Sequence, residues 1–342
     1  MICLFLETKK GLPVYQQSTK KTLRNHHRNV RNSVNLLYGI VWLCSKDTAK
    51  DADFIIDCDL YKLYNLCSLY ILYNLCNHHR KGSEIIKVLV FCIQKGGVGK
   101  TSIAHSTAIG LLKRGNSVLC VDVDSQANLS VLFGMGEPDD YSGTYEVLTG
   151  KAKISDVIIH TDSGADLCPA SIDLSAIDLE LSGTMGREYL LFKALKDVSG
   201  NYDYCVIDTP PALGLSTINA LTAADFVVIP VTADDFSVRG IRQLNRTIEV
   251  VKKNCNPDLV IAGYLLNRTD NTKLTKAISD ALRQGETRVF QHTIRQAVAV
   301  RESQLFKTDA FSEGSRLLRQ DIDNYLDELL TTIAERGEHG KK

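Results

Sequence analysis

Residues 94–102 form a glycine-rich run with two lysines, and this combination of residue types is suited to holding phosphate groups. The run reads Gln-Lys-Gly-Gly-Val-Gly-Lys-Thr-Ser. Glycines let backbone N–H groups turn inward around phosphate oxygens. A lysine beside them neutralises phosphate charge, and a threonine hydroxyl is a ligand for Mg²⁺. We therefore expect Lys100 to contact the β- and γ-phosphates of a nucleotide and Thr101 to hold Mg²⁺.

Two further segments place carboxylates directly after apolar runs. Asp122 and Asp124 follow Val-Leu-Cys-Val, and Asp208 follows Tyr-Cys-Val-Ile and precedes Thr-Pro-Pro. A carboxylate at the C-terminal end of a parallel strand can reach Mg²⁺ directly or through a bound water. We expect Asp208 to be such a ligand. The alternatives are an aspartate-rich turn for the first segment and an ordinary strand-end aspartate for the second.

These residues need strands and helices to position them. The expected strands are 87–93, 117–121, 165–168, 204–207, 226–231 and 259–266, and the expected helices are 100–114, 185–197, 215–223, 237–253, 272–283 and 314–335. Near-continuous apolar strands that alternate with helices predict a parallel sheet covered on both faces. The predicted fold class is therefore α/β, with a mostly parallel twisted sheet and helices on both faces.

The phosphate-binding run departs from the general pattern G-x-x-x-x-G-K-[ST], because Gln94 stands where glycine is expected and Lys95 precedes the paired glycines. It resembles the deviant Walker A loop of the ParA/MinD/Soj family of ATPases, and most closely that of the ParA/Soj branch. The resemblance covers roughly residues 87–335. It implies a P-loop NTPase fold, ATP and Mg²⁺ as cofactors, and an ATP-dependent homodimer in which Lys95 reaches the nucleotide of the partner subunit.

The same resemblance assigns further site residues. The segment from Asp122 to Asn128 resembles the family's D-x-D-P-Q-x-N switch, with Ser125 in place of proline, and this match puts Asp124 near the attacking water. Asp208-Thr-Pro-Pro resembles its Walker B segment. The implied catalytic residues are Lys95, Lys100 and Asp124, and the implied ATP-binding residues are Lys95, Gly96, Gly97, Val98, Gly99, Lys100, Thr101, Ser102, Pro230, Asn267 and Arg268. In this set Asn267 reads the adenine edge, since its amide both donates and accepts; an ordinary turn residue is the alternative.

Basic residues in the second half of the domain are candidates for DNA contact. Residues 268–319 contain ten lysines and arginines and six aspartates and glutamates. An ATP-dependent dimer would double such a patch, which suits sequence-independent contacts to phosphates. The DNA-binding candidates are Arg283, Arg295, Arg301 and Arg316. A solvated face of mixed charge is the alternative reading.

The last predicted helix bears on membrane binding. It carries apolar residues on one face, and its other face holds Asp321, Asp323, Asp327, Glu328 and Glu335. Helices that lie on membranes favour lysine and arginine on the polar face. We therefore expect a helix that packs in the core, with no stable membrane association. Ten cysteines and no recognisable secretory signal favour a cytoplasmic protein with reduced thiols.

These features together predict a DNA partition ATPase for a plasmid or chromosome. In this hypothesis an ATP-induced dimer binds duplex DNA without sequence preference, associates with the nucleoid, and is stimulated to hydrolyse ATP by a ParB-like DNA-binding partner. The alternatives are a MinD-like ATPase that positions structures at the membrane, and an ATPase that positions protein scaffolds. The formal net charge of zero excludes none of them, since a basic patch can be offset elsewhere.

The predicted ATPase domain spans residues 83–337, between an atypical N-terminal extension at 1–82 and a short polar tail at 338–342. The extension is rich in tyrosine, leucine, asparagine and cysteine, and it repeats Leu-Tyr-Asn-Leu-Cys at 63–67 and 72–76. Three readings stay open for it: a basic, disordered DNA-binding arm around residues 20–31, a zinc site, and upstream sequence translated from a misplaced start.

Overall fold

The computed structural model describes residues 86–136, 141–232, 238–270, 273–284, 288–296 and 316–339. The expected N-terminal extension, the DNA-binding candidate Arg301 and residues 340–342 of the expected tail lie outside the described residues.

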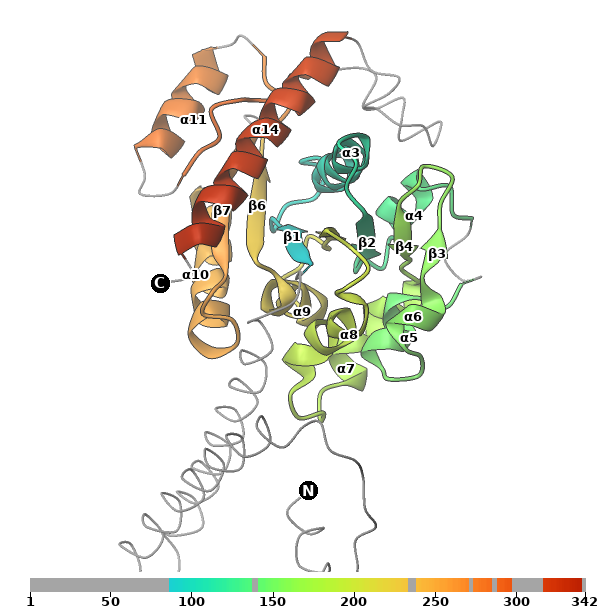
Figure 1. Ribbon diagram of the computed structural model, residues 1–342. Helices are drawn as coiled ribbons and strands as arrows, with labels where there is room; N and C mark the ends of the chain where they lie inside the picture. The colour runs from blue at the N-terminus through green and yellow to red at the C-terminus, as the bar shows by residue number, and fades with distance from the viewer. Residues whose placement is uncertain are drawn as a thin grey trace, which may run out of the picture. The chain divides into compact units, whose positions relative to one another are not determined.

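Seven strands form one twisted sheet in the order β3-β4-β2-β5-β1-β6-β7 (Figure 1). They are β1 (Lys87–Phe91), β2 (Val118–Asp122), β3 (Ile159–His160), β4 (Asp166–Cys168), β5 (Tyr204–Asp208), β6 (Phe226–Val231) and β7 (Val260–Leu266). All neighbours pair in parallel except β3 and β4, which are antiparallel. The prediction of an α/β fold with a mostly parallel sheet is confirmed.

Helices cover both faces of this sheet because the central strands are apolar on both sides. Val88 and Val90 of β1 belong to one core cluster, and Leu89 and Phe91 belong to the other. One face is covered by α3 (Lys100–Lys113), α4 (Asn128–Leu132) and α14 (Arg316–His339) (Figure 1). The other is covered by α5 (Thr144–Leu148), α6 (Ile154–Val157), α7 (Ile177–Glu180), α8 (Leu190–Val198), α9 (Leu215–Ala223), α10 (Val238–Asn254) and α11 (Lys273–Arg283).

The predicted strands and helices are present with shifts of a few residues at their ends, and several short elements were missed. The prediction contained no counterpart to β3, α4, α5, α6 or α7, nor to the 3₁₀ helix η2 (Ile172–Ala176). The predicted helix 185–197 is a 3₁₀ turn, η3 (Arg187–Tyr189), that leads into α8. The missed helices have four or five residues and the missed strand has two, which is too short to show a period, whereas β1, β2 and β5 were recognised as apolar runs.

The last helix packs in the core, as predicted. Its residues Leu318, Ile322, Tyr325, Leu326, Leu329 and Ile333 are buried against α3 and the sheet. Leu317, which was expected on the same face, is 53% exposed. Among the described residues, every helix is too short or too polar to cross a lipid bilayer.

Candidate functional site

The phosphate-binding run forms the loop between β1 and the first turn of α3. Gly97 and Gly99 have φ angles of 79° and 86°, which are in the left-handed region that favours glycine. Gly99 immediately precedes α3, and its carbonyl accepts the first helical hydrogen bond, from Ile103 N at 3.0 Å. The loop therefore ends at a helix N-terminus, where free N–H groups and the helix dipole attract anions.

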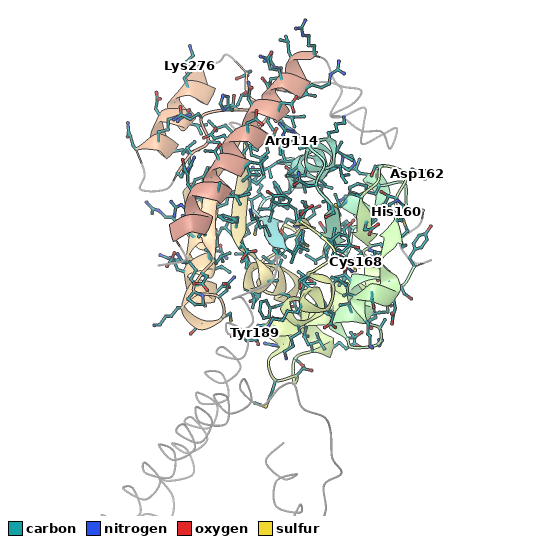
Figure 2. All side chains as sticks on the ribbon, in the orientation of Figure 1. Arg114, His160, Asp162, Cys168, Tyr189 and Lys276 are labelled. Carbon is teal, nitrogen blue, oxygen red and sulfur yellow. The ribbon has the colours of Figure 1, made fainter. Side chains whose placement is uncertain are left out.

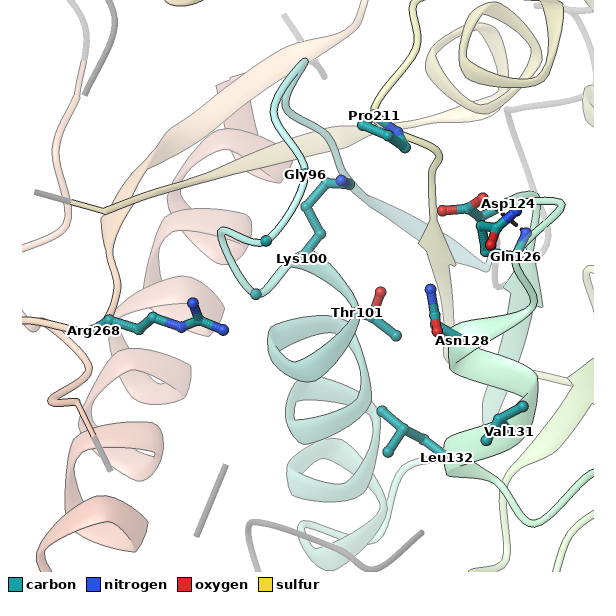
Figure 3. A pocket seen from close by; sticks show the side chains of 12 residues that line it. Gly96, Lys100, Thr101, Asp124, Gln126, Asn128, Val131, Leu132, Pro211 and Arg268 are labelled. Carbon is teal, nitrogen blue, oxygen red and sulfur yellow. Dashed lines mark hydrogen bonds between the residues drawn. The ribbon is translucent and has the colours of Figure 1, made fainter. Parts of the chain in front are cut away.

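A cavity of about 380 Å³ lies over this loop (Figure 3). Seven predicted site residues line it: Gly96, Gly97, Gly99, Lys100, Thr101, Asp124 and Arg268. Figure 3 shows Lys100 extending toward Pro211, while Arg268 points at the loop from one side and Asp124 lies on the other. Cations and N–H groups thus converge on a space that also contains a carboxylate and a threonine hydroxyl.

Five cavity residues were absent from the predicted set. Gln126 and Asn128 lie in the aspartate-rich segment, and Pro211 follows Asp208-Thr-Pro, so the motifs themselves were a signal for all three. Val131 and Leu132 lie on the short helix α4, and nothing in the sequence distinguishes them from ordinary core residues. The predicted residues Lys95, Val98, Ser102, Pro230, Asn267 and Asp208 are not among the lining residues.

Asp208 is fully buried at the end of β5, next to Lys100 and Thr101 of the phosphate loop. It ends β5, and in register it pairs with Phe91 at the end of β1 and with Asp122 at the end of β2. Neither of its carboxylate oxygens has a hydrogen bond of good geometry among the described residues. Burial raises the pKa of Asp208 well above its usual value, and the charge of Asp122 raises it further; the Thr101 hydroxyl and the Lys100 charge act in the opposite direction.

A divalent cation would satisfy these orphaned oxygens. Mg²⁺ prefers carboxylate and hydroxyl oxygens together with phosphate oxygens and water. Asp208 and Thr101 supply the first two ligand types at the edge of the phosphate loop. The donor set therefore fits Mg²⁺ bound together with a nucleotide. Among the described residues there is no group of three or more histidine, cysteine, aspartate or glutamate side chains that could form an all-protein metal site.

Asp122 organises the turn that carries Asp124. Its carboxylate is fully buried and accepts hydrogen bonds from Asp124 N at 3.1 Å, Ser130 N at 2.9 Å and Ser130 Oγ at 2.8 Å. Burial raises the pKa of Asp122 to about 6, and the hydrogen bonds from Ser130 and Asp124 limit the rise. Asp124 is 6% exposed and accepts a hydrogen bond from Gln126 N at 3.0 Å. Asp122 is thus a structural residue, and Asp124 faces the cavity.

Asn267 contacts the phosphate loop itself. Its Nδ2 donates to the Val98 carbonyl at 2.8 Å, and its Oδ1 accepts from Arg268 N at 2.9 Å. A Cβ on Gly99 would lie 2.5 Å from Asn267 Nδ2, so glycine is needed there for the contact as well as for its φ angle. The Asn267 amide therefore bonds backbone through both its nitrogen and its oxygen, and the side chain ties the end of β7 to the loop. Pro230 is buried within β6.

The DNA-binding candidates differ in their surroundings. Arg283 is exposed, and its Nη2 donates to the Phe290 carbonyl at 3.1 Å. Arg295 forms an ion pair with Asp321, with Nε and Oδ2 2.6 Å apart. Arg316 is exposed at the start of α14. The structure does not gather these three side chains into one contact cluster.

A loop of this kind between the central strand and a helix of a parallel sheet, with a carboxylate at the end of the adjacent strand, defines a P-loop nucleotide-binding protein. The AAA domain family model matches residues 86–261. The sporulation initiation inhibitor protein Soj of Bacillus subtilis is 42% identical over 185 residues, which are 54% of this chain and 73% of Soj. The chromosome partitioning protein ParA of Caulobacter vibrioides is 38% identical over 226 residues, which are 65% of this chain and 85% of ParA.

The chain is also similar to a solved structure that contains a nucleotide. Cobyrinic acid a,c-diamide synthase from Mycobacterium smegmatis, with a bound ATP analog and magnesium, is 35% identical and matches with a TM-score of 0.60. The match covers 68% of this chain and 98% of that one. The chain belongs to the ParA/Soj family of P-loop ATPases.

Proposed function

We propose that the protein is a partition ATPase that hydrolyses Mg·ATP and uses the ATP-bound state to hold DNA. Membership of the ParA/Soj family makes the chain an ATPase, with ATP as substrate and Mg²⁺ as its ion. The observation that carries the assignment to partition is the Lys95-Gly-Gly form of the phosphate loop, found together with Asp124 in the cavity and with the ParA and Soj relatives.

The nucleotide roles follow from the positions of the side chains. The backbone N–H groups of residues 96–99 and the Lys100 ammonium bind the phosphates, and Thr101 and Asp208 hold the metal ion. Bound Mg²⁺ neutralises charge that develops on the transferred phosphoryl group. Asp124 accepts a hydrogen bond from the attacking water and orients it. Arg268 and Asn267 close the side of the site beside β7.

In this proposal, Lys95 of one subunit contacts the nucleotide that is bound to the other subunit of the dimer. It is absent from the residues that line the cavity of its own chain, although its neighbours Gly96 and Gly97 are present. A second cation near the γ-phosphate would stabilise charge in the transition state. The dimer would then form with ATP and dissociate after hydrolysis, which a ParB-like partner accelerates. Such a protein would be cytoplasmic and associated with the nucleoid.

The fold favours DNA over a membrane as the surface that is bound. Apart from Leu317, most apolar residues of α14 are buried against α3 and the sheet, so the apolar face of this helix is not available to lipid. The exposed arginines Arg283 and Arg316 are available for phosphate contacts, and Arg301 remains a candidate outside the described residues. Neutralising several phosphates gives binding that weakens steeply with salt.

The test is ATP-dependent retention on random duplex DNA, measured together with the mass of the complex. We expect the wild-type protein to dimerise and bind DNA with Mg·ATP but not with Mg·ADP, and Asp124→Ala to keep both properties with ATP while losing hydrolysis. Asp124→Ala that hydrolyses at the wild-type rate would contradict the role of Asp124. Binding to anionic liposomes with no retention on DNA would contradict the assignment to DNA partition.

A further inference from the structure

Three carboxylates on α14 face a short basic segment beside β7. Asp321, Glu328 and Glu335 are spaced by seven residues, so they lie along one side of the helix. Their partners lie on residues 288–296, in the order Arg295, His292 and Arg288. Figure 1 shows α14 crossing over β6 and β7, next to which this segment runs. We call the three basic residues the basic row.

The contact between Asp321 and Arg295 is the strongest of the three. Arg295 Nε lies 2.6 Å from Asp321 Oδ2, and Nη2 lies 2.8 Å from Oδ1, so the pair is bidentate. The backbone N of Arg295 also donates to Oδ2 at 3.1 Å. The Asp321 side chain is 14% exposed, and that of Arg295 is 42% exposed. The Arg295 side chain is thus partly open to solvent while its charge is paired.

Glu328 is also held closely by the segment, whereas Glu335 is not. Glu328 accepts from Gln291 N and His292 N at 2.9 Å and 3.1 Å and lies 3.1 Å from the His292 ring. Arg288 and Glu335 are 3.7 Å apart, with side chains 32% and 60% exposed. An exposed pair at that distance contributes little to stability. Asp321 is therefore the carboxylate that most closely pairs with an arginine of the basic row.

The ion pair can open without unfolding the segment. The backbone of the segment is hydrogen-bonded to β7 and the residues after it, as in Tyr264 N to the Arg288 carbonyl at 2.9 Å and Ile294 N to the Leu266 carbonyl at 2.9 Å. Phe290 is fully buried, and its ring meets that of Tyr325 on α14 edge-on at 5.3 Å. These contacts hold the segment and α14 together whether or not Arg295 is paired with Asp321.

We propose that the basic row is a surface for the phosphates of duplex DNA, and that Asp321 competes with DNA for Arg295. This inference rests on the proposed partition function and adds an internal competitor to it. A carboxylate and a phosphate bind the guanidinium fork in the same bidentate way, so the two are mutually exclusive partners. A seven-residue step on a helix is about 10.5 Å, close to the axial length of three nucleotides, about 10 Å.

The experiment compares Asp321→Asn with a control of equal charge change. Asp327 lies on the same helix and pairs with Arg114 at 2.8 Å, away from the basic row (Figure 2 shows Arg114 beside α3). Wild type, Asp321→Asn, Asp327→Asn and the double variant Asp321→Asn/Arg295→Gln are titrated with random duplex DNA and Mg·ATP at several salt concentrations. ATP hydrolysis without DNA and thermal melting check that each variant is folded.

When the logarithm of the binding constant is plotted against the logarithm of the salt concentration, each phosphate contact makes the negative slope steeper by about 0.9. For Asp321→Asn we expect a slope steeper by about 0.9 for each chain, and binding at 0.1 M salt tighter by about eightfold for each arginine released. Asp327→Asn and the double variant should keep the wild-type slope. Equal slopes for Asp321→Asn and wild type would overturn the competition while leaving partition intact. Wild type and Asp321→Asn that both fail to bind DNA would overturn both proposals.

Discussion

The buried carboxylate of Asp208 should destabilise the nucleotide-free protein, and replacing it should therefore raise the melting temperature. Asp208→Asn keeps the shape of the side chain and removes its charge. In the wild type neither oxygen has a hydrogen bond of good geometry among the described residues. Burial and the charge of Asp122 on the neighbouring strand disfavour the carboxylate more than the Thr101 hydroxyl and the Lys100 charge favour it, so its pKa is raised. A neutral amide costs less to bury than a carboxylate in these surroundings.

The expected change in melting temperature can be estimated from the cost of burying the Asp208 carboxylate. A buried polar group without a partner costs about 1–3 kcal/mol, and more if it is charged. Relief of about 1–3 kcal/mol in a domain of this size corresponds to a rise in Tm of roughly 2 to 12 °C. Asp203, at the other end of β5, is the control, because its carboxylate is exposed and accepts from Ser117 N at 2.8 Å and Ser117 Oγ at 2.7 Å. Asp203→Asn should not raise Tm.

The assay is thermal melting of wild type, Asp208→Asn and Asp203→Asn in EDTA and again with excess Mg·ATP. A ligand at a hundred times its Kd stabilises the folded state by about 2.7 kcal/mol. Wild type should show a gain of this order, and Asp208→Asn should show much less because it has lost a metal ligand. The reasoning is refuted if Asp208→Asn melts below wild type in EDTA, or if Mg·ATP stabilises both proteins equally.

Three further predictions concern single residues. Lys100→Ala should abolish ATP binding in calorimetry, because it removes the cation at the start of α3, and unchanged heat on titration would contradict this. Asp124→Ala should give dimers that persist with ATP in light scattering, whereas dimers that dissociate at the wild-type rate would count against its catalytic role. Gly143→Ala should lower stability by about 1–3 kcal/mol or more in urea unfolding, since its Cβ would lie 2.0 Å from the Pro169 carbonyl oxygen, while Gly183→Ala, with nothing within 4 Å, should change it little.

The sequence predicts well those parts of the fold that have a clear apolar run or helical pattern, or a distinctive glycine-rich loop. The strand around Val88–Phe91, the glycine loop and α3 could be placed because apolar runs and glycines act locally. The edge strand β3 could not, because two residues, Ile159 and His160, carry no periodicity and pair only through the fold.

The same distinction between local motifs and distant contacts applies to the residues of the candidate site. Lys100, Thr101 and Asp124 were placed in the cavity from their motifs. The contact of Asn267 with the Val98 carbonyl was not predicted, because Val98 is 169 residues away in the sequence; the role of Asn267 at the adenine edge stays a prediction. The acidic face of α14 was read only as an argument against membrane binding, and its pairing was not predicted: Asp321 pairs with Arg295, in a segment whose position depends on the end of β7. Contacts between distant segments depend on register, which a single sequence does not reveal.

Strand β1 lies inside the sheet, between β5 and β6, and this position has a consequence for the synthesis of the chain. Its two sheet partners are β5 and β6, and β5 begins at Tyr204, so 113 residues separate its start from Phe91 at the end of β1 (204 − 91). At roughly 5–20 residues per second, the apolar stretch Val-Leu-Val-Phe leaves the ribosome about 6 to 23 seconds before it can pair. An unpaired strand of this kind is prone to aggregate. The nascent protein should therefore depend on a chaperone that shields β1 until the middle of the domain has been translated.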